Sequence, residues 1–237
     1  MVAFDGHVKP SFWTKRGATA LAFSPDGRIV ATGGHDGAVK LWDSATGLVK
    51  RSFDAHDGEI VSIEFSPDGK MIASVGWDKT VCIWETSTGI ELATLRSKRD
   101  YGKDPVVKFS PDGGTLAVHR GSHVELWKVA MKESSVDSRR PELSYHLADV
   151  FIQPVCPYVG FWKTSLAFSP DGHTIVASAG TAVMFDITTS SLVWRFVPTG
   201  DKFRNDGING LAFSPDGKSL TAATNNGVYL WEFQRGE

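Results

Sequence analysis

Five copies of one pentapeptide, Phe-Ser-Pro-Asp-Gly, constrain what this chain of 237 residues can fold into. Their first residues are Phe23, Phe65, Phe109, Phe168 and Phe213, so the copies start 42, 44, 59 and 45 residues apart. Self-similarity at such a spacing is the signature of a repeat array, in which each repeat supplies one small unit of structure. We therefore expect one body built from similar units rather than two unrelated domains.

Each copy of the pentapeptide lies between two stretches of strand-like sequence. Residues 60–65 alternate between apolar and polar side chains, and residues 70–75 follow the turn with a second apolar-rich stretch. An alternation with a period of two predicts a half-buried β-strand. The Pro of the turn presets φ, and the Asp-Gly pair supplies a local hydrogen bond and a positive φ, so the chain reverses direction. Further turns such as Asp36-Gly37 and Thr46-Gly47 predict a third and a fourth strand in the repeat.

The third strand of each repeat ends in an aromatic residue, 17 to 19 residues after the Phe of the turn. These aromatic residues are Trp42, Trp84, Trp127, Phe185 and Trp231, and an acidic residue follows all of them except Trp127. The turn and the Trp-Asp pair resemble those of the WD-repeat β-propeller family, and the resemblance covers nearly the whole chain. It implies an all-β fold, a β-propeller of five four-stranded blades.

The resemblance implies a single propeller over residues 1–237. Its blades are expected near residues 18–53, 59–95, 104–152, 164–196 and 207–233. The last blade lacks an outer strand in its own sequence, and residues 2–12 are expected to supply that strand and so to close the ring. The third blade is expected to carry a loop insertion near residues 129–146, either a plain solvated loop or a site of phosphorylation or partner contact.

The alternative to a closed ring is a piece of a larger ring, because the family usually has seven blades. Each blade buries its faces against its neighbours, so an open array would leave an apolar blade face in water. We expect such an open array to self-associate.

Composition and charge narrow the classes of partner. Hydrophobic residues make up 41% and charged residues 22% of the chain, as in ordinary soluble globular proteins. The net charge of −2 gives no overall field that would hold nucleic acid or an anionic membrane. No apolar run approaches the roughly 18 residues of a membrane helix. Two cysteines and the absence of an Asn-x-Ser/Thr sequon favour a reducing compartment, the cytoplasm or the nucleus.

The family resemblance also implies a structural hydrogen-bond network within a blade. The network joins a His before the first strand, a Ser or Thr in the second strand, an Asp in the following turn and the Trp of the third strand. In the second blade these residues are His56, Ser74, Asp78 and Trp84. In the first blade, which has no such His, the corresponding residues are Thr32, Asp36 and Trp42. A buried network of this kind stabilises a fold when every member has a partner.

The same side chains could be taken for a catalytic triad, but no Gly-x-Ser-x-Gly elbow exposes a nucleophile. The tripeptide Gly217-Lys218-Ser219 resembles the end of a phosphate-binding loop, but Ala212 stands where that loop needs a Gly. The spacing of the His and Cys residues does not predict a metal site. We therefore expect a noncatalytic protein with no cofactor and no metal.

A propeller presents loops on one face, where members of the family commonly receive peptides or partner domains. His35, Trp77 and Arg120 lie at the turns after the second strands and are expected on that face. The loops before the first strands are expected to add Lys15, Arg16, Arg99, Tyr101, Phe203 and Arg204. Basic and aromatic side chains favour an acidic or phosphorylated peptide. The sequence therefore predicts a protein-binding scaffold or adaptor, or alternatively a sensor or regulatory propeller of a larger multidomain signalling protein.

Overall fold

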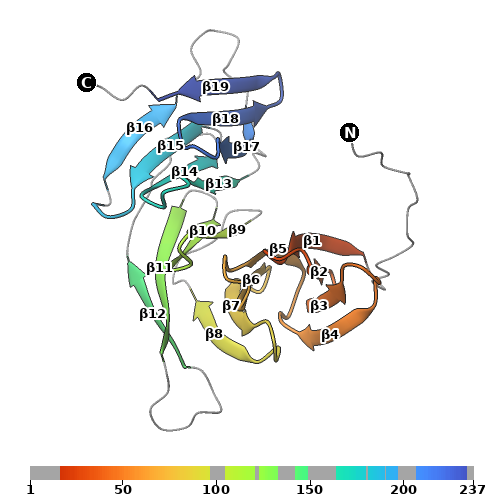
Figure 1. Cartoon of the computed structure of the whole chain (residues 1–237). Coiled ribbons are helices and arrows are strands. Elements are labelled where there is room, and N and C mark those ends of the chain that lie inside the picture. Colours follow the sequence, from red (N-terminus) through yellow and green to blue (C-terminus); the bar gives the residue numbers. More distant parts are fainter. Residues whose placement is uncertain are drawn as a thin grey trace.

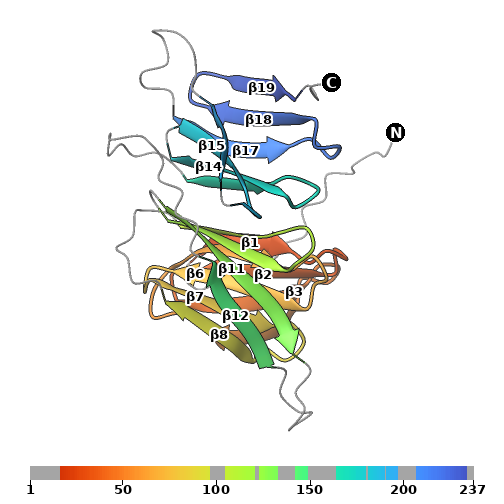
Figure 2. The ribbon, with the colours of Figure 1, turned by 90° about the vertical axis from the view of Figure 1, so that its left-hand side faces the viewer.

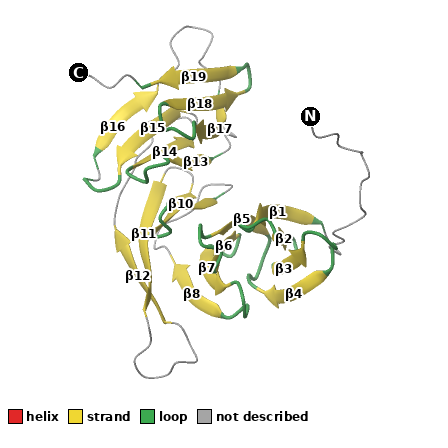
Figure 3. Ribbon diagram, viewed as in Figure 1, coloured by secondary structure: helices red, strands yellow, loops and turns green. Residues whose placement is uncertain are grey.

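The computed structural model describes residues 17–96, 105–120, 123–132, 142–148, 164–179, 181–189, 191–196 and 207–233. These residues form antiparallel β-strands joined by turns and loops, and none of them lies in a helix (Figure 3). No segment within these ranges therefore has the helical length and apolar character that a membrane crossing requires. The all-β fold class expected from the repeats is confirmed for these residues.

The described strands form five antiparallel sheets, each made of strands that follow one another in the chain. The first sheet contains β1 (Ala18–Phe23), β2 (Ile29–Gly34), β3 (Ala38–Asp43) and β4 (Val49–Asp54). The second contains β5 (Ile60–Phe65), β6 (Met71–Gly76), β7 (Thr80–Glu85) and β8 (Glu91–Arg96). The third contains β9 (Val106–Phe109), β10 (Thr115–Arg120), β11 (His123–Lys132) and β12 (Glu142–Ala148). The fourth contains β13 (Ser165–Phe168), β14 (Thr174–Ala179), β15 (Thr181–Asp186) and β16 (Leu192–Phe196). The last contains β17 (Ile208–Phe213), β18 (Ser219–Thr224) and β19 (Val228–Glu232).

The turns formed by the pentapeptide are built from their own side chains, as the turn between β5 and β6 illustrates. The Ser66 hydroxyl donates to Asp68 Oδ1 at 2.6 Å and accepts from the Met71 amide at 2.9 Å. The Lys70 amide donates to the same Asp68 oxygen at 3.0 Å. Gly69 has a φ of +71°, a conformation that Gly adopts without strain. Local sequence is therefore enough to set the hairpin.

The first strands of successive sheets lie side by side, so the sheets follow one another around an arc (Figure 1). Strand β1 contacts β5, β5 contacts β9, β9 contacts β13 and β13 contacts β17. Figure 1 shows the first sheet, in red and orange, and the last sheet, in blue, at the two ends of this row, and Figure 2 shows the last sheet at the top of the view. Among the described residues, no strand of the first sheet pairs with a strand of the last. Residues 2–12, which were expected to close a ring, lie outside the described residues.

Apolar side chains are buried between neighbouring sheets rather than in one central core. Val39 and Leu41 of β3 belong to the same cluster as Ile63 and Phe65 of β5. Similar clusters join the second sheet to the third, the third to the fourth and the fourth to the last. Because each cluster takes its residues from two sheets, an interior sheet needs a neighbour on each of its faces.

The third sheet differs from the loop insertion expected near residues 129–146. Strand β11 continues to Lys132, and β12 begins at Glu142. The two strands pair continuously from Leu126 opposite Ala148 to Lys132 opposite Glu142. Strand pairing therefore occupies both ends of the expected loop, because an antiparallel ladder continues as long as its backbone groups face each other.

Candidate functional site

The turns β2–β3 and β6–β7 lie at the same end of the sheets as the segment between β4 and β5. We call the surface formed by these three segments the loop face, which comprises residues 35–37, 55–59 and 77–79. The Trp77 amide donates to the Glu59 carbonyl at 2.9 Å. His35 Nδ1 lies 2.8 Å from Glu59 Oε2. Glu59 therefore joins the turn of the first sheet to the turn of the second.

Trp77 is the most exposed tryptophan of the described residues. It is 64% exposed, whereas Trp84 on the next strand is only 5% exposed. Trp77 follows the last residue of β6, so the turn carries its ring out of the sheet and onto the loop face. Tryptophan dominates the energetics of many protein interfaces, since its large apolar surface is removed from water on binding. This exposed ring is therefore the strongest candidate for a contact anchor.

The pair formed by His35 and Glu59 lies beside Trp77 and is partly open to water. The side chain of His35 is 52% exposed and that of Glu59 is 22% exposed. Sequence reasoning placed His35 on this face but missed Glu59, which lies 24 residues further along the chain. The only sequence signal for Glu59 is an acidic residue directly before a predicted first strand.

A buried hydrogen-bond network lies beneath the β6–β7 turn. Trp84 Nε1 donates to Ser74 Oγ at 3.1 Å, and Ser74 Oγ lies 2.8 Å from His56 Nε2. His56 Nδ1 in turn lies 3.0 Å from Asp78 Oδ1. The Thr80 hydroxyl, which the sequence analysis did not include, donates to the same Asp78 oxygen at 2.8 Å. The structure thus brings all four expected residues of the second sheet together and adds Thr80.

Asp78 is ionised at neutral pH although it is partly buried. Burial raises the pKa of Asp78, but the amide and hydroxyl of Thr80, the neighbouring His56 and the Asp57 amide together hold that pKa below its ordinary value. The Asp57 amide donates to Asp78 Oδ2 at 3.1 Å. The carboxylate therefore ties the segment before β5 to the turn that carries Trp77.

The first sheet has a shorter form of this network. Trp42 Nε1 donates to Thr32 Oγ1 at 2.8 Å. Asp36 Oδ2 lies 2.9 Å from the Lys40 ammonium. The first sheet has Thr14 at the position of the His in the sequence, and Thr14 lies outside the described residues. In the other sheets the position of Ser74 is occupied by residues without a hydroxyl, and these are Val118, Ala177 and Ala222.

Arg120 does not lie on the loop face as expected. It is only 3% exposed, and its Nη1 donates to the Lys79 carbonyl at 3.2 Å. The side chain turns back toward the second sheet, where it holds the β6–β7 turn from the side of the third sheet. Arg120 is therefore a structural bridge between two sheets and not an exposed contact residue.

The remaining residues expected to bind a partner cannot be placed. Lys15, Arg16, Arg99, Tyr101, Phe203 and Arg204 all lie outside the described residues. Within the described part of the loop face, the ionisable side chains nearest to Trp77 in the chain are Asp78 and Lys79, and Glu59 and Asp57 are joined to the same turn by backbone hydrogen bonds. The described segments around Trp77 therefore carry both acidic residues and the basic Lys79.

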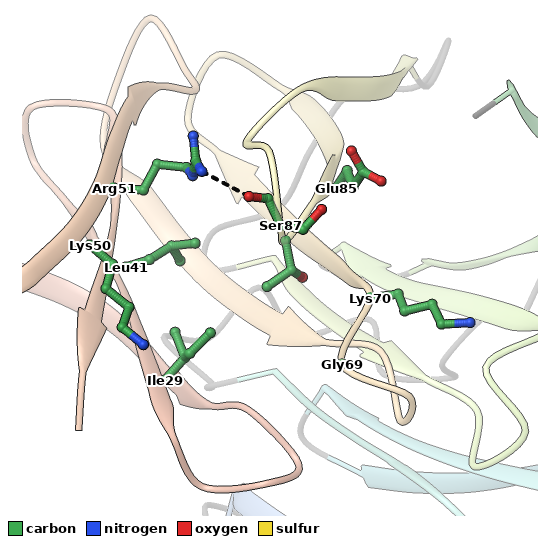
Figure 4. Close-up of a pocket in the computed structure, with 9 residues that line it drawn as sticks. Ile29, Leu41, Lys50, Arg51, Gly69, Lys70, Glu85 and Ser87 are labelled. Carbon is green, nitrogen blue, oxygen red and sulfur yellow. Dashed lines mark hydrogen bonds between the residues drawn. The ribbon is translucent and has the colours of Figure 1, made fainter. Parts of the chain in front are cut away.

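A groove of about 440 Å³ lies at the opposite end of the first two sheets (Figure 4). Arg51 crosses the groove, and its Nη2 donates to the Ser87 carbonyl at 2.8 Å. Lys50 and Lys70 also line it, together with Glu85. The sequence analysis did not predict this groove, because its walls come from strands of the first sheet and from turns of the second. Its mixed charges do not single out a ligand.

No group of three or more His, Cys, Asp or Glu side chains within the described ranges is arranged to hold a metal ion. The only ring-to-carboxylate contacts of His35 and His56 in those ranges are the ones given above. The described part of the loop face thus combines the exposed ring of Trp77 with the hydrogen-bonded residues beneath it.

Comparison with protein-family models gives one family. The model of the WD domain, G-beta repeat, matches residues 2–43, 47–85 and 196–232. The chain is 41% identical to the Periodic tryptophan protein 2 homolog of Dictyostelium discoideum over 44 residues, which are 19% of this chain and 5% of the relative. It is 49% identical to WD repeat-containing protein 81 of Homo sapiens over 45 residues, which are 19% of this chain and 2% of the relative.

A longer match is to Apoptotic protease-activating factor 1 of Homo sapiens, with 27% identity over 170 residues. That match covers 71% of this chain but 13% of the relative. The chain therefore spans only a small part of the length of these relatives. The matched repeats, the recurring turns with their strand-ending aromatic residues and the four-stranded antiparallel sheets agree with one another, and the chain belongs to the WD-repeat family.

Proposed function

We propose that this protein is a noncatalytic scaffold or adaptor that binds a protein or peptide partner on the loop face. The observation that carries the proposal is the 64% exposure of Trp77 on a turn held by a buried network. A rigidly held aromatic residue loses little conformational freedom on binding, so most of its buried apolar area contributes to affinity. Trp77 is the anchor in this proposal, and His35 with Glu59 forms its polar rim.

The chemistry of the partner follows from the charges around the anchor. The exposed indole of Trp77 favours an apolar or cationic partner side chain directly on the ring, with the acidic residues Asp57 and Glu59 in the neighbouring segment. A contact with an acidic or phosphorylated segment stays part of the proposal, through the basic residues Lys15, Arg16, Arg99 and Arg204. A reducing compartment, the cytoplasm or the nucleus, is proposed as the place of binding, and the free buried thiol of Cys82 is compatible with it.

A second candidate is a sensor or regulatory propeller that forms part of a larger multidomain signalling protein. The small share of each relative that the chain covers, 2% to 13% in the three matches above, favours this candidate. Both candidates use the same loop face and differ in what is attached to it. The identity of the partner, and not the structure of the site, distinguishes the two candidate functions.

The test is affinity capture from a cell extract with the wild-type chain and a His35→Ala/Trp77→Ala variant, followed by affinity measurement with any partner that is recovered. We expect the variant to bind at least about tenfold more weakly, since truncating an anchor residue typically costs 2 kcal/mol or more. A Trp194→Ala variant is the matched control, because Trp194 on β16 is 62% exposed but lies far from the loop face along the chain. Equal binding by the wild type and the His35→Ala/Trp77→Ala variant, with circular dichroism showing both folded, would disprove the assigned face.

A further inference from the structure

The first sheet exposes an apolar face, whereas the equivalent face of the second sheet is buried. Leu21 and Phe23 of β1 are 67% and 61% exposed. Ile63 and Phe65 occupy the same positions of β5, relative to the pentapeptide turn, and are 4% and 6% exposed. The difference arises because β5 has the first sheet beside it, whereas no described residue lies in that place beside β1.

The last sheet exposes an apolar face on its other side, which is formed by its third strand rather than its first. Val228 and Leu230 of β19 are 74% and 59% exposed. Val39 and Leu41 stand at the same distances before the strand-ending Trp of β3, and they are 0% and 2% exposed because they pack on the second sheet. The last sheet therefore presents the side that an interior sheet offers to its successor.

The pentapeptide turns show the same unfilled place beside the first sheet. A Cβ built on Gly69 would lie 3.4 Å from Cδ of Pro25, and one on Gly113 would lie 3.5 Å from Cδ of Pro67. Each turn thus packs on the turn of the preceding sheet. A Cβ built on Gly27, in the first sheet, meets no heavy atom within 4 Å.

The two exposed faces correspond to the two sides of the interface that joins the first sheet to the second. Inside the chain, the pair Val39 and Leu41 packs in one cluster with the pair Ile63 and Phe65. Val228 and Leu230 reproduce the first pair, and Leu21 and Phe23 reproduce the second with Leu in place of Ile. All four exposed side chains are uncharged, so burying them requires no ion to leave water.

We propose that the face formed by Val228 and Leu230 of one copy of this chain packs against the face formed by Leu21 and Phe23 of a second copy. The contact continues the interface that already joins one sheet to the next within the chain. It is heterologous, because it uses two different surfaces, so each copy keeps one unused face that can bind a further copy. The proposal does not depend on the loop face.

Two double variants test this proposal. Leu21→Asp/Phe23→Asp disables the first-sheet face, and Val228→Asp/Leu230→Asp disables the last-sheet face. The exposure of all four residues makes these changes compatible with folding, which circular dichroism and thermal unfolding of each variant check. Light scattering coupled to size-exclusion chromatography over a range of concentrations then gives the mass of each species relative to the 25.8 kDa chain.

We expect the wild type to form dimers and larger species as its concentration rises, and each variant alone to stay monomeric. An equimolar mixture of the two variants should form a species of twice the monomer mass and nothing larger, since each variant retains one functional face. Leu48→Asp/Val49→Asp is the matched control, because these residues are 68% and 50% exposed but lie directly before and at the start of the outer strand β4. This control should associate like the wild type.

Three outcomes would overturn the proposal. A wild type that is monomeric at every concentration would mean that the chain covers both faces itself, as in a closed ring. A variant that self-associates alone would mean that the contact uses like faces or another surface. A mixture of the two variants that stays monomeric would mean that the two faces do not recognise each other.

Discussion

The imidazole Nδ1 of His35 and the carboxylate Oε2 of Glu59 lie 2.8 Å apart and join the first sheet to the second across the loop face. The backbone carbonyl of Glu59 also accepts a hydrogen bond from the Trp77 amide. Glu59 therefore positions both His35 and the turn that carries Trp77. The side chain of His35 is 52% exposed, and side-chain contacts that are this open to water contribute little to stability.

We therefore predict that Glu59→Gln lowers the free energy of unfolding by less than about 1 kcal/mol, the range of exposed pairs. Urea unfolding of the variant and the wild type measures this difference. Partner affinity should fall less for Glu59→Gln than for Trp77→Ala, because the backbone contact to Trp77 is kept. A larger loss of affinity in Glu59→Gln than in Trp77→Ala would show that Trp77 is not the anchor residue.

Ser74→Ala should destabilise the fold by about 1 to 3 kcal/mol, because it removes the acceptor of the buried Trp84 indole and a partner of His56. The matched control is Ser178→Ala. Ser178 is 1% exposed, and its hydroxyl makes no hydrogen bond to the described residues. Removing that hydroxyl should leave stability unchanged or raise it slightly. Equal losses in chemical denaturation for the two variants would argue against a stabilising network.

Gly76→Ala should destabilise the second sheet through a direct clash. A Cβ on Gly76 would lie 2.7 Å from Cγ and Nδ1 of the His56 ring, which is held on both sides by the network. Overpacking of this kind typically costs about 1 to 3 kcal/mol. Gly58→Ala is the control, because its nearest contact would be 3.7 Å to Trp77 Cβ, an ordinary van der Waals distance. Thermal unfolding of both variants should show a clear loss for Gly76→Ala alone.

Acid should weaken the fold at the turns that follow the third strands. The amide and hydroxyl of Thr46 hydrogen-bond to Asp43 and lower its pKa from 3.8 to about 2. Because the folded-state pKa is below the unfolded one, the associated stability is complete above about pH 4 and is lost as the pH falls toward 2. Asp43→Asn should reduce this part of the pH dependence. Unfolding curves recorded from pH 5 to pH 2 test the prediction, and identical pH profiles for the variant and the wild type would contradict it.

The elements that the sequence predicts correctly are those set by local hydrogen bonds. The turn at Ser66, Asp68 and Gly69 forms its hydrogen bonds within the six residues from Ser66 to Met71. Its sequence therefore identifies it in each repeat. Two of the contacts that were missed join separate sheets, whereas the missed contact of Thr80 with Asp78 lies within the second sheet. Arg120 reaches the Lys79 carbonyl and Glu59 reaches His35, and no spacing within one repeat reveals that the two partners meet.

The third sheet shows a different limit of sequence interpretation. The segment from Val129 to Lys132 was expected at the start of a loop, because the polar residues that follow it resemble an insertion. In the structure it continues β11, since the backbone of β12 provides partners as far as Glu142. Polar side chains occur both in loops and on antiparallel strands with one solvated face, so polarity alone does not separate a loop from a strand.

The fourth sheet has Phe185 and Ala177 where the second has Trp84 and Ser74, so the indole donor and its hydroxyl acceptor are both absent. Apolar groups replace both members of the pair, which leaves neither a buried donor nor a buried acceptor at these two positions. The third and last sheets keep Trp127 and Trp231 although Val118 and Ala222 stand at the position of Ser74, so the two positions do not change together in every sheet. Substitutions in different sheets are expected to have additive effects on stability. Each repeat can change its internal polar pair independently, while the apolar layers between repeats keep the whole row cooperative.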